Sequence, residues 1–236
     1  MLNDYTLKEI YASSNVRHLF QALTHITMSY PGFIDKQVYD QQLLEEYKSL
    51  LTDQSRSGSL SYNLYHFIRL TRSTREKWSM DTWRVMDSLE NDWNKFLSVP
   101  YNLRSVRHFL DQVINHAIAF IGLHADSMTR HHGWSMFEIG RRTELAILTT
   151  SLLRSVLVHT PGRKDNDIDP LEVLLRSNDN LISYRYLYRS TINPRDVAHL
   201  MVFNSINARS VLFQVEQVEK NLQQIKGHSD FMNDED

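Results

Sequence analysis

Apolar residues recur every three or four positions along nearly the whole chain, which is the spacing of the buried face of an α-helix. The longest such stripe consists of Val106, Phe109, Leu110, Val113, Ile114, Ala117, Phe120 and Ile121. A second stripe steps by four and three through Val211, Val215, Val218, Leu222 and Ile225. The first stripe predicts a long helix with one buried face. The second predicts a helix that packs lengthwise against a neighbour through these residues.

Capping residues and prolines divide this pattern into nine predicted helices. The expected helices span residues 5–29, 36–52, 59–77, 80–98, 102–130, 134–159, 170–189, 194–204 and 208–226. The expected N-cap residues are Asp35, Ser79, Asp169 and Asn193. Pro170 and Pro194 follow the last two at the first helical position, where proline loses no hydrogen bond. Gly227 is expected to end the last helix.

This succession of elements predicts an all-α fold, a single bundle of eight or nine helices over residues 1–226. Residues 227–236 are expected to form a disordered acidic tail. Two short sequence echoes, between residues 16–21 and 106–111 and between residues 59–64 and 210–215, suggest two repeated halves of about 1–100 and 101–226. Duplication and chance both explain matches as short as these.

The composition agrees with a folded, helical chain. Of its 236 residues, 42% are hydrophobic, which is enough to fill a core. Only 7 Gly and 5 Pro occur, too few for the many tight turns of a β-sandwich.

Charge and cysteine content narrow the function classes. The 26 basic and 28 acidic residues nearly cancel, so no overall field draws the chain to nucleic acid or to a membrane. The absence of cysteine excludes disulfides, cysteine-ligated metals and thiol nucleophiles. With no signal-peptide pattern and no apolar run long enough to span a bilayer, we expect a cytoplasmic protein. The sequence leaves homo-oligomer formation open.

Motifs for metals and nucleotides do not support a cofactor in this chain. A di-metal helical bundle needs Glu-x-x-His on two helices, and the nearest pattern is a single Asp196-x-x-His199. His108, His116 and His124 are eight residues apart, which rotates each by roughly 80° from the last and prevents a shared ligand face. The glycine-rich phosphate loops of nucleotide-binding proteins do not occur.

Two opposite charges fall within an apolar stripe of the helix predicted at 134–159. Arg141 and Glu144 lie within about 40° of the line through Phe137 and Leu148, so we expect both to be partly buried. A structural ion pair, a ligand-facing or catalytic pair, and an exposed face are the three readings of this arrangement.

Arginines and aromatic residues gather in two further places. One group contains Arg72 and Arg75, with Trp83 following. The other contains Asp179, Tyr184 and Arg185. Arginines at such spacing can bind carboxylate or phosphate groups, and they are also common on solvated helix faces.

Several of these motifs, in this order, resemble the bacterial alpha-E domain family. Gly133-Trp134 leads into residues 140–146, Gly-Arg-Arg-Thr-Glu-Leu-Ala, which is similar to the family's signature helix Gly-Arg-x-x-Glu-Arg-Ala. Residues 58–64 with Arg72 and Arg75 resemble its first-half segment, and Asp179, Tyr184-Arg185 and residues 207–211, with Arg209, resemble its second-half segment. The chain departs from the pattern at Leu145, where the family has arginine.

The resemblance also predicts a missing element. The signature helix occurs once per half in the family, and Glu144 precedes Ser210 by 66 positions. Applied to Ser59, the same interval places the first copy before Met1. We therefore expect the family's opening helix to be absent here and to come from an upstream fused domain or from another chain.

The resemblance implies a companion of circularly permuted ATP-grasp proteins, with transglutaminase-like or proteasome-like peptidases in the same system. ATP and magnesium would bind to the partner, and this chain would help an ATP-dependent carboxylate–amine ligase. Under this hypothesis the residues that contact an anionic substrate are Arg72, Arg75, Asp179, Tyr184, Arg185 and Arg209, with Arg141 and Glu144 as the catalytic candidates. The alternatives are an enzyme with Glu144 as general base, and a purely structural interaction bundle.

Overall fold

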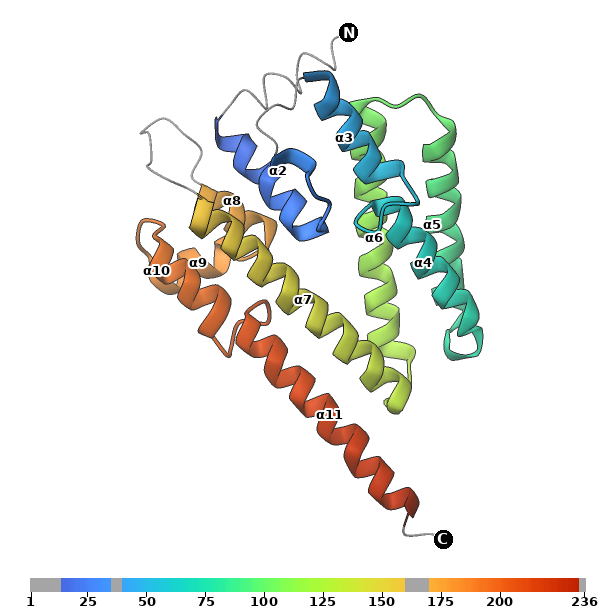
Figure 1. The fold of residues 1–236 in the computed structure, drawn as a ribbon. Helices are drawn as coiled ribbons and strands as arrows, with labels where there is room; N and C mark the ends of the chain where they lie inside the picture. The colour runs from blue at the N-terminus through green and yellow to red at the C-terminus, as the bar shows by residue number, and fades with distance from the viewer. Residues whose placement is uncertain (1–13, 35–39, 160–169, 234–236) are drawn as a thin grey trace. The chain divides into compact units, whose positions relative to one another are not determined.

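The computed structural model describes residues 14–34, 40–159 and 170–233, and every regular element in these ranges is helical (Figure 1). The α-helices are α2 (Ser14–Thr27), α3 (Asp40–Thr52), α4 (Leu60–Ser73), α5 (Met80–Ser98), α6 (Leu103–Ser127), α7 (His132–His159), α8 (Pro170–Ser177), α9 (Leu181–Tyr188), α10 (Pro194–Ala198) and α11 (Val211–Asn233). Short helical turns follow at η1 (Gly32–Ile34), η2 (Arg75–Lys77) and η3 (His199–Phe203). The predicted all-α class is confirmed.

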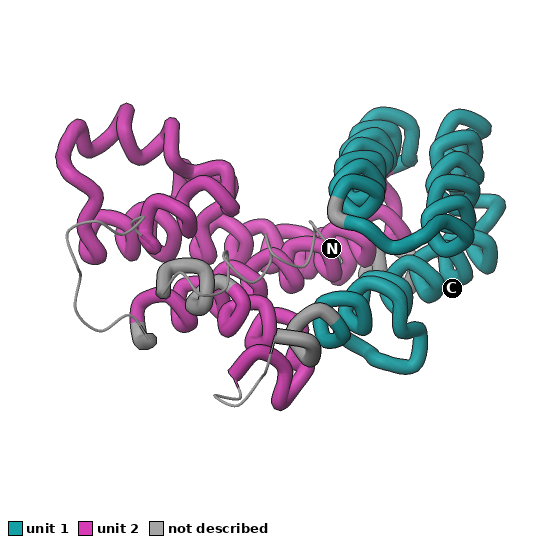
Figure 2. The backbone as a smooth tube through the Cα atoms, turned by 90° about the horizontal axis from the view of Figure 1, so that it is seen from above, with its two compact units in different colours: residues 1–9, 38–129 teal, residues 10–37, 130–236 magenta. Residues whose placement is uncertain are grey.

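The chain divides into two compact units (Figure 2). Unit 1 comprises residues 1–9 and 38–129 and holds α3 to α6, whereas unit 2 comprises residues 10–37 and 130–236 and holds α2 and α7 to α11. The predicted repeated halves rest on sequence echoes, and this division does not test them. The expected absence of the family's opening helix concerns a position before Met1, so the described residues do not test it.

In unit 1, α5 and α6 pack side by side and α4 contacts α6 through aromatic rings. Phe96 of α5 stacks on Phe109 of α6 with ring centroids 4.3 Å apart and planes only 5° from parallel. Phe67 of α4 meets Phe120 of α6 edge to face at 5.0 Å. Aromatic pairs of this kind add to the stabilisation that burial alone gives.

In unit 2, α7 packs against both α2 and α11, so two of its faces are covered. The apolar core of this unit lies where the end of α7 meets the short helices. It consists of Leu153, Val156, Leu174, Leu175, Leu181, Tyr184, Val197, Leu200 and Met201. Because the short helices bury these residues almost completely, they form one body with α7.

Side-chain caps begin several helices where the sequence predicts them. Ser79 accepts a hydrogen bond from the backbone N–H of Thr82, and Asn193 accepts one from that of Asp196. Each satisfies a backbone donor that the first helical turn leaves unpaired. The other two predicted caps, Asp35 and Asp169, lie outside the described residues.

Some predicted boundaries are wrong. The helix expected at 170–189 is two helices, because Asp179 has a left-handed backbone (φ +56°) that short polar residues tolerate and that ends α8. The helix expected at 59–77 ends at Ser73 and continues as the turn η2. The last helix passes through Gly227 to Asn233, since one glycine costs only about 1 kcal/mol inside a helix. Residues 227–233 are thus helical rather than a disordered tail.

The stripe on α6 is only partly buried. Val106, Phe109 and Phe120 lie in the core as predicted, whereas Ile114 and Ile121 are exposed. The long helix is confirmed, but its buried face is narrower than the apolar pattern.

Gly32 provides a test of the local packing beside α2. Its backbone is left-handed (φ +50°), and a Cβ atom there would lie 2.5 Å from Oγ1 of Thr24. That hydroxyl accepts a hydrogen bond from the N–H of Phe33 at 2.8 Å, so it cannot move away freely. We expect Gly32→Ala to lower the free energy of unfolding by about 2–4 kcal/mol, measured by urea denaturation.

The matched control is Gly140→Ala, because a Cβ at this exposed position in the middle of α7 meets nothing within 4 Å. Alanine there should raise the free energy of unfolding by about 0.5–1 kcal/mol. Equal effects of the two substitutions would contradict the geometry described for Gly32.

Candidate functional site

A buried carboxylate shared by two arginines lies in the first half of α7. Glu138 accepts hydrogen bonds from Arg141, whose Nε and Nη2 reach its two oxygens at 2.9 and 2.8 Å. Arg142 adds a third bond, from Nε to Oε2 of Glu138 at 3.0 Å. The three residues meet because the residues three and four positions after Glu138 lie on the same face of the helix as Glu138.

The environment keeps Glu138 ionised. Its side chain is only 9% exposed, and those of Arg141 and Arg142 are 24% and 18% exposed. Burial alone would raise the pKa of Glu138, but the hydrogen bonds and charges of the two arginines outweigh it and hold the pKa below its usual value. Burial, together with the charge of Arg141, lowers the pKa of Arg142. Two cations and one anion leave a net positive charge at this site.

Arg142 also connects α7 to α11. Its Nη1 donates to Oε1 of Gln214 at 3.1 Å, and its guanidinium lies 5.5 Å from the ring centre of Phe213. Gln214 is buried and donates in turn to the backbone oxygen of Ala208 at 2.6 Å. The ion pair on α7 therefore fixes the start of α11 and the segment before it.

Asparagine side chains hold that segment, residues 204–210, in place. Oδ1 of Asn204 accepts hydrogen bonds from the backbone N–H groups of Ile206 and Asn207 at 2.9 and 3.1 Å. Asn207 donates to Oδ1 of Asn180 at 3.1 Å and to the backbone oxygen of Leu200 at 2.9 Å. Because Leu200 belongs to the apolar core of unit 2 and Asn180 is buried, the polar network runs from α7 through the segment to that core.

The expected burial of Glu144 beside Arg141 is wrong, and of the three interpretations the exposed face holds for Glu144. Glu144 is exposed, and it lies about 120° around α7 from Glu138. Arg141 is half-buried as expected, but its partner is Glu138. A role of Glu144 as general base stays a prediction.

The predicted packing face of α11 is only partly right: Val211, Val218 and Ile225 are half-buried as expected. Val215 is 53% exposed and Leu222 is exposed as well, whereas Gln214 and Asn221 are buried. The cause is the polar face of α7, since Arg142 needs an acceptor that valine and leucine cannot provide.

The structure brings together two residues of the second-half segment. Arg209 and Asp179 approach to 3.8 Å, and both are exposed. Arg185 is exposed and lies 3.7 Å from Glu172. Tyr184 lies in the core, where its hydroxyl donates to the backbone oxygen of Thr191 and accepts from the backbone N–H of Asn193, so it does not present a binding surface.

The first-half arginines are exposed in unit 1. Arg72 forms an ion pair with Glu90 of α5. The guanidinium of Arg75 lies 5.6 Å from the ring centre of Trp83. These contacts link η2 and the end of α4 to α5, which is a structural role that the sequence did not specify.

Sequence reasoning missed Glu138, Arg142 and Gln214. Because α7 is covered by two helices, its apolar residues do not form one stripe, and the face of Glu138 could not be recognised as buried. The spacing of Glu138 to Arg141 and Arg142 was a usable signal, since a glutamate three and four residues before arginine favours pairing.

In the described residues, no group of three or more His, Asp or Glu is placed to hold a metal ion. No helix of the described ranges is long and apolar enough to cross a membrane.

Removal of the Glu138 charge tests the network. We expect Glu138→Gln to lower the free energy of unfolding by about 3 kcal/mol. This is the lower end of the cost of breaking a buried ion pair, because the two guanidinium groups are partly exposed to water. Glu144→Gln on the same helix should change it by less than about 0.5 kcal/mol. The measurement is urea unfolding of each variant, and similar losses in both would argue against a special role of Glu138.

The pH dependence gives a second test. Because the pKa of Glu138 is lowered in the folded chain, its stabilisation is present above the ordinary value of 4.5 and is lost as the pH falls through the folded pKa. The difference in unfolding free energy between the wild type and Glu138→Gln should therefore be constant at neutral pH and shrink below pH 4.5. A difference that grows on acidification would reverse the sign of the expected linkage.

Comparison with known proteins finds relatives of this chain in mycobacteria. The chain is 28% identical over 187 residues to uncharacterised proteins of Mycobacterium bovis and Mycobacterium tuberculosis, and 27% identical to one from a second M. tuberculosis strain. Each alignment covers 77% of this chain and 21% of the relative, so the chain spans about a fifth of their length. No solved structure matches.

A sequence profile of the Alpha-E family, described as a predicted alpha-helical domain with a conserved ER motif, matches residues 1–235. Nowhere in this chain does arginine directly follow glutamate, yet Glu138 pairs with Arg141 and Arg142 in space. With the match covering almost the whole sequence and the helices as observed, the chain belongs to the Alpha-E family.

Proposed function

We propose that this chain is the helical companion of an ATP-grasp-type carboxylate–amine ligase, and that Arg141 and Arg142 hold an anionic group of its substrate. In this proposal the ATP and magnesium sites belong to the partner, together with the chemical step that joins acid and amine. The chain contributes a docking surface and a positive site.

The observation that carries the proposal is the excess of positive charge around Glu138. Two guanidinium groups share one carboxylate, and the neutral Gln214 takes the remaining bond of Arg142. Nη1 of Arg141 and Nη2 of Arg142 donate to none of the described residues. A planar fork of N–H donors that keeps partial access to solvent suits a carboxylate or phosphate oxygen.

Two further observations support a partner protein. The relatives are about five times longer than the matched segment, so in them this domain is one part of a larger polypeptide. In this chain the outward side of α11 exposes Leu212, Val215 and Leu222, an apolar row suited to a protein partner. We assign that row to the ligase.

A structural interaction bundle is the second candidate, and one observation favours it. Both oxygens of Glu138 are already bonded, and Arg142 is bonded on two sides, as in a network that only fixes the packing of α7 on α11. The two candidates differ in whether the guanidiniums also meet a substrate.

Reconstitution of the ligase reaction separates them. The rate of ATP-dependent amide formation by the cognate ATP-grasp protein is measured without this chain, with the wild type and with Arg141→Lys. We expect the chain to be required, and Arg141→Lys to lower kcat/KM about 10-fold or more, because lysine keeps the charge and loses the fork.

The controls keep the test specific. Glu144→Gln should leave the rate unchanged, and the rates of Arg141→Lys and the wild type are compared well below the Tm of both, so that unfolding does not contribute to the loss. Val215→Asp, on the exposed row of α11, should abolish stimulation without lowering Tm. If stimulation persists in Arg141→Lys and is lost in Val215→Asp, the structural bundle is the better account; if the wild-type chain has no effect, both the ligase role and the docking surface are wrong.

A further inference from the structure

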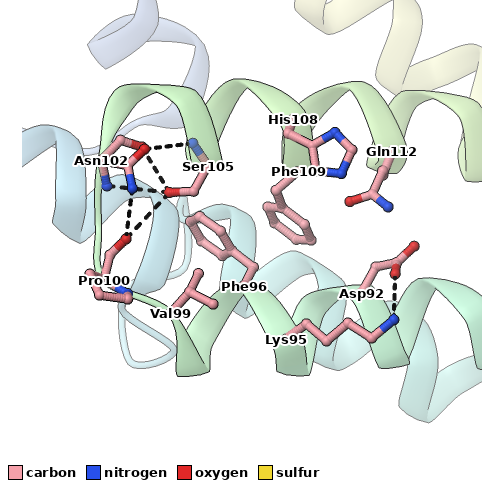
Figure 3. Close-up of a pocket in the computed structure, with 10 residues that line it drawn as sticks. All are labelled: Asp92, Lys95, Phe96, Val99, Pro100, Asn102, Ser105, His108, Phe109 and Gln112. Atoms are coloured by element: carbon pink, nitrogen blue, oxygen red, sulfur yellow. Dashed lines mark hydrogen bonds and ion pairs between the residues drawn. The ribbon is translucent and has the colours of Figure 1, made fainter.

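A groove in unit 1 has the size and lining of a small-molecule site. It lies between the second half of α5 and the first half of α6, and its volume is about 390 Å³ (Figure 3). This is within the usual range of roughly 300–1,000 Å³ for ligand pockets. A second cavity, between α2 and α7 in unit 2, has about 150 Å³ and falls below it.

The floor of the groove is apolar. Phe96 and Phe109 stack across the two helices, and Val99 forms an exposed apolar edge. The corner between the helices is fixed by reciprocal hydrogen bonds of Asn102 and Ser105. A ligand can therefore place an apolar body over this floor without reorganising the backbone.

The polar residues of the groove select an anion. Asp92 is 13% exposed, and its carboxylate already accepts a hydrogen bond from Nε2 of His116 at 3.0 Å and lies 3.6 Å from Nζ of Lys95. The Lys95 side chain is 78% exposed, so most of its hydrogen-bonding capacity is unused. An amine ligand would meet this ammonium and find the carboxylate already paired.

Two donors from α6 complete the arrangement. His108 and Gln112 line the groove opposite Asp92 and Lys95 in Figure 3, and neither side chain forms a hydrogen bond with the described residues. Gln112 has amide N–H donors, and an imidazole N–H is available on His108. The groove thus combines the ammonium of Lys95, the already paired carboxylate of Asp92, two further polar side chains and an aromatic floor.

We propose that this groove binds a small monocarboxylic acid with an apolar body, with the carboxylate at Lys95, His108 and Gln112 and the body over Phe96 and Val99. The proposal concerns unit 1 alone and does not depend on the function proposed for Arg141 and Arg142. The test uses 4-phenylbutyrate as the probe. 4-Phenylbutylamine carries the same body with the opposite charge.

The experiment is a titration of the full-length, ¹⁵N-labelled chain followed by amide chemical shifts. The acid should bind with Kd on the order of 1 mM, a modest affinity for a ligand of this size, and shift amides of residues 92–112. The amine should bind at least fivefold more weakly. Equal binding of the two probes, shifts confined to other residues, or no saturable shift would overturn the proposal.

Two lysine variants complete the test. Lys95→Gln should weaken binding of the acid about fivefold and leave binding of the amine the same or tighter. Lys77→Gln, an exposed lysine on η2 that does not line the groove, is the matched control and should change neither. An unchanged affinity of Lys95→Gln for the acid would remove the assigned carboxylate position. Because both lysines are exposed, both variants are expected to fold.

Discussion

The arrangement of unit 2 depends on one buried carboxylate that two guanidinium groups share. Glu138 can stay ionised at 9% exposure only because Arg141 and Arg142 bind both of its oxygens. Arg142 then requires an acceptor on the neighbouring helix, which Gln214 provides. The buried face of α11 therefore includes Gln214 and Asn221 beside half-buried apolar residues, while Val215 and Leu222 are exposed.

The burial of Gln214 and Asn221 affects the stability of unit 2. A helix that buries glutamine and asparagine gains less stabilisation from apolar burial. Here the hydrogen-bond network from α7 through residues 204–210 stabilises the packing instead. The same choice leaves Val215 and Leu222 available for contact with another protein. The charge site and the exposed row are therefore two consequences of one ion pair, while the groove of unit 1 arises independently from the packing of α5 on α6.

The sequence predicted the fold class and several helix boundaries, because caps and prolines act locally. Ser79 and Asn193 begin their helices as expected, and α5 spans its predicted residues. The buried faces were harder to predict, since they depend on tertiary contacts. The apolar residues Phe137 and Leu148 predicted that Glu144 would be buried. Because α2 and α11 both pack against α7, these residues do not mark its whole buried surface, and the buried acid is Glu138. The groove was missed because its residues become a site only when two helices pack together.

The most direct measurement is NMR of the arginine Nε–H groups in the full chain. If Glu138 holds both guanidiniums, the Nε–H signals of Arg141 and Arg142 exchange slowly with water, whereas that of the exposed Arg185 exchanges fast. Exchange of Arg141 and Arg142 as fast as that of Arg185 would contradict the shared carboxylate and everything derived from it.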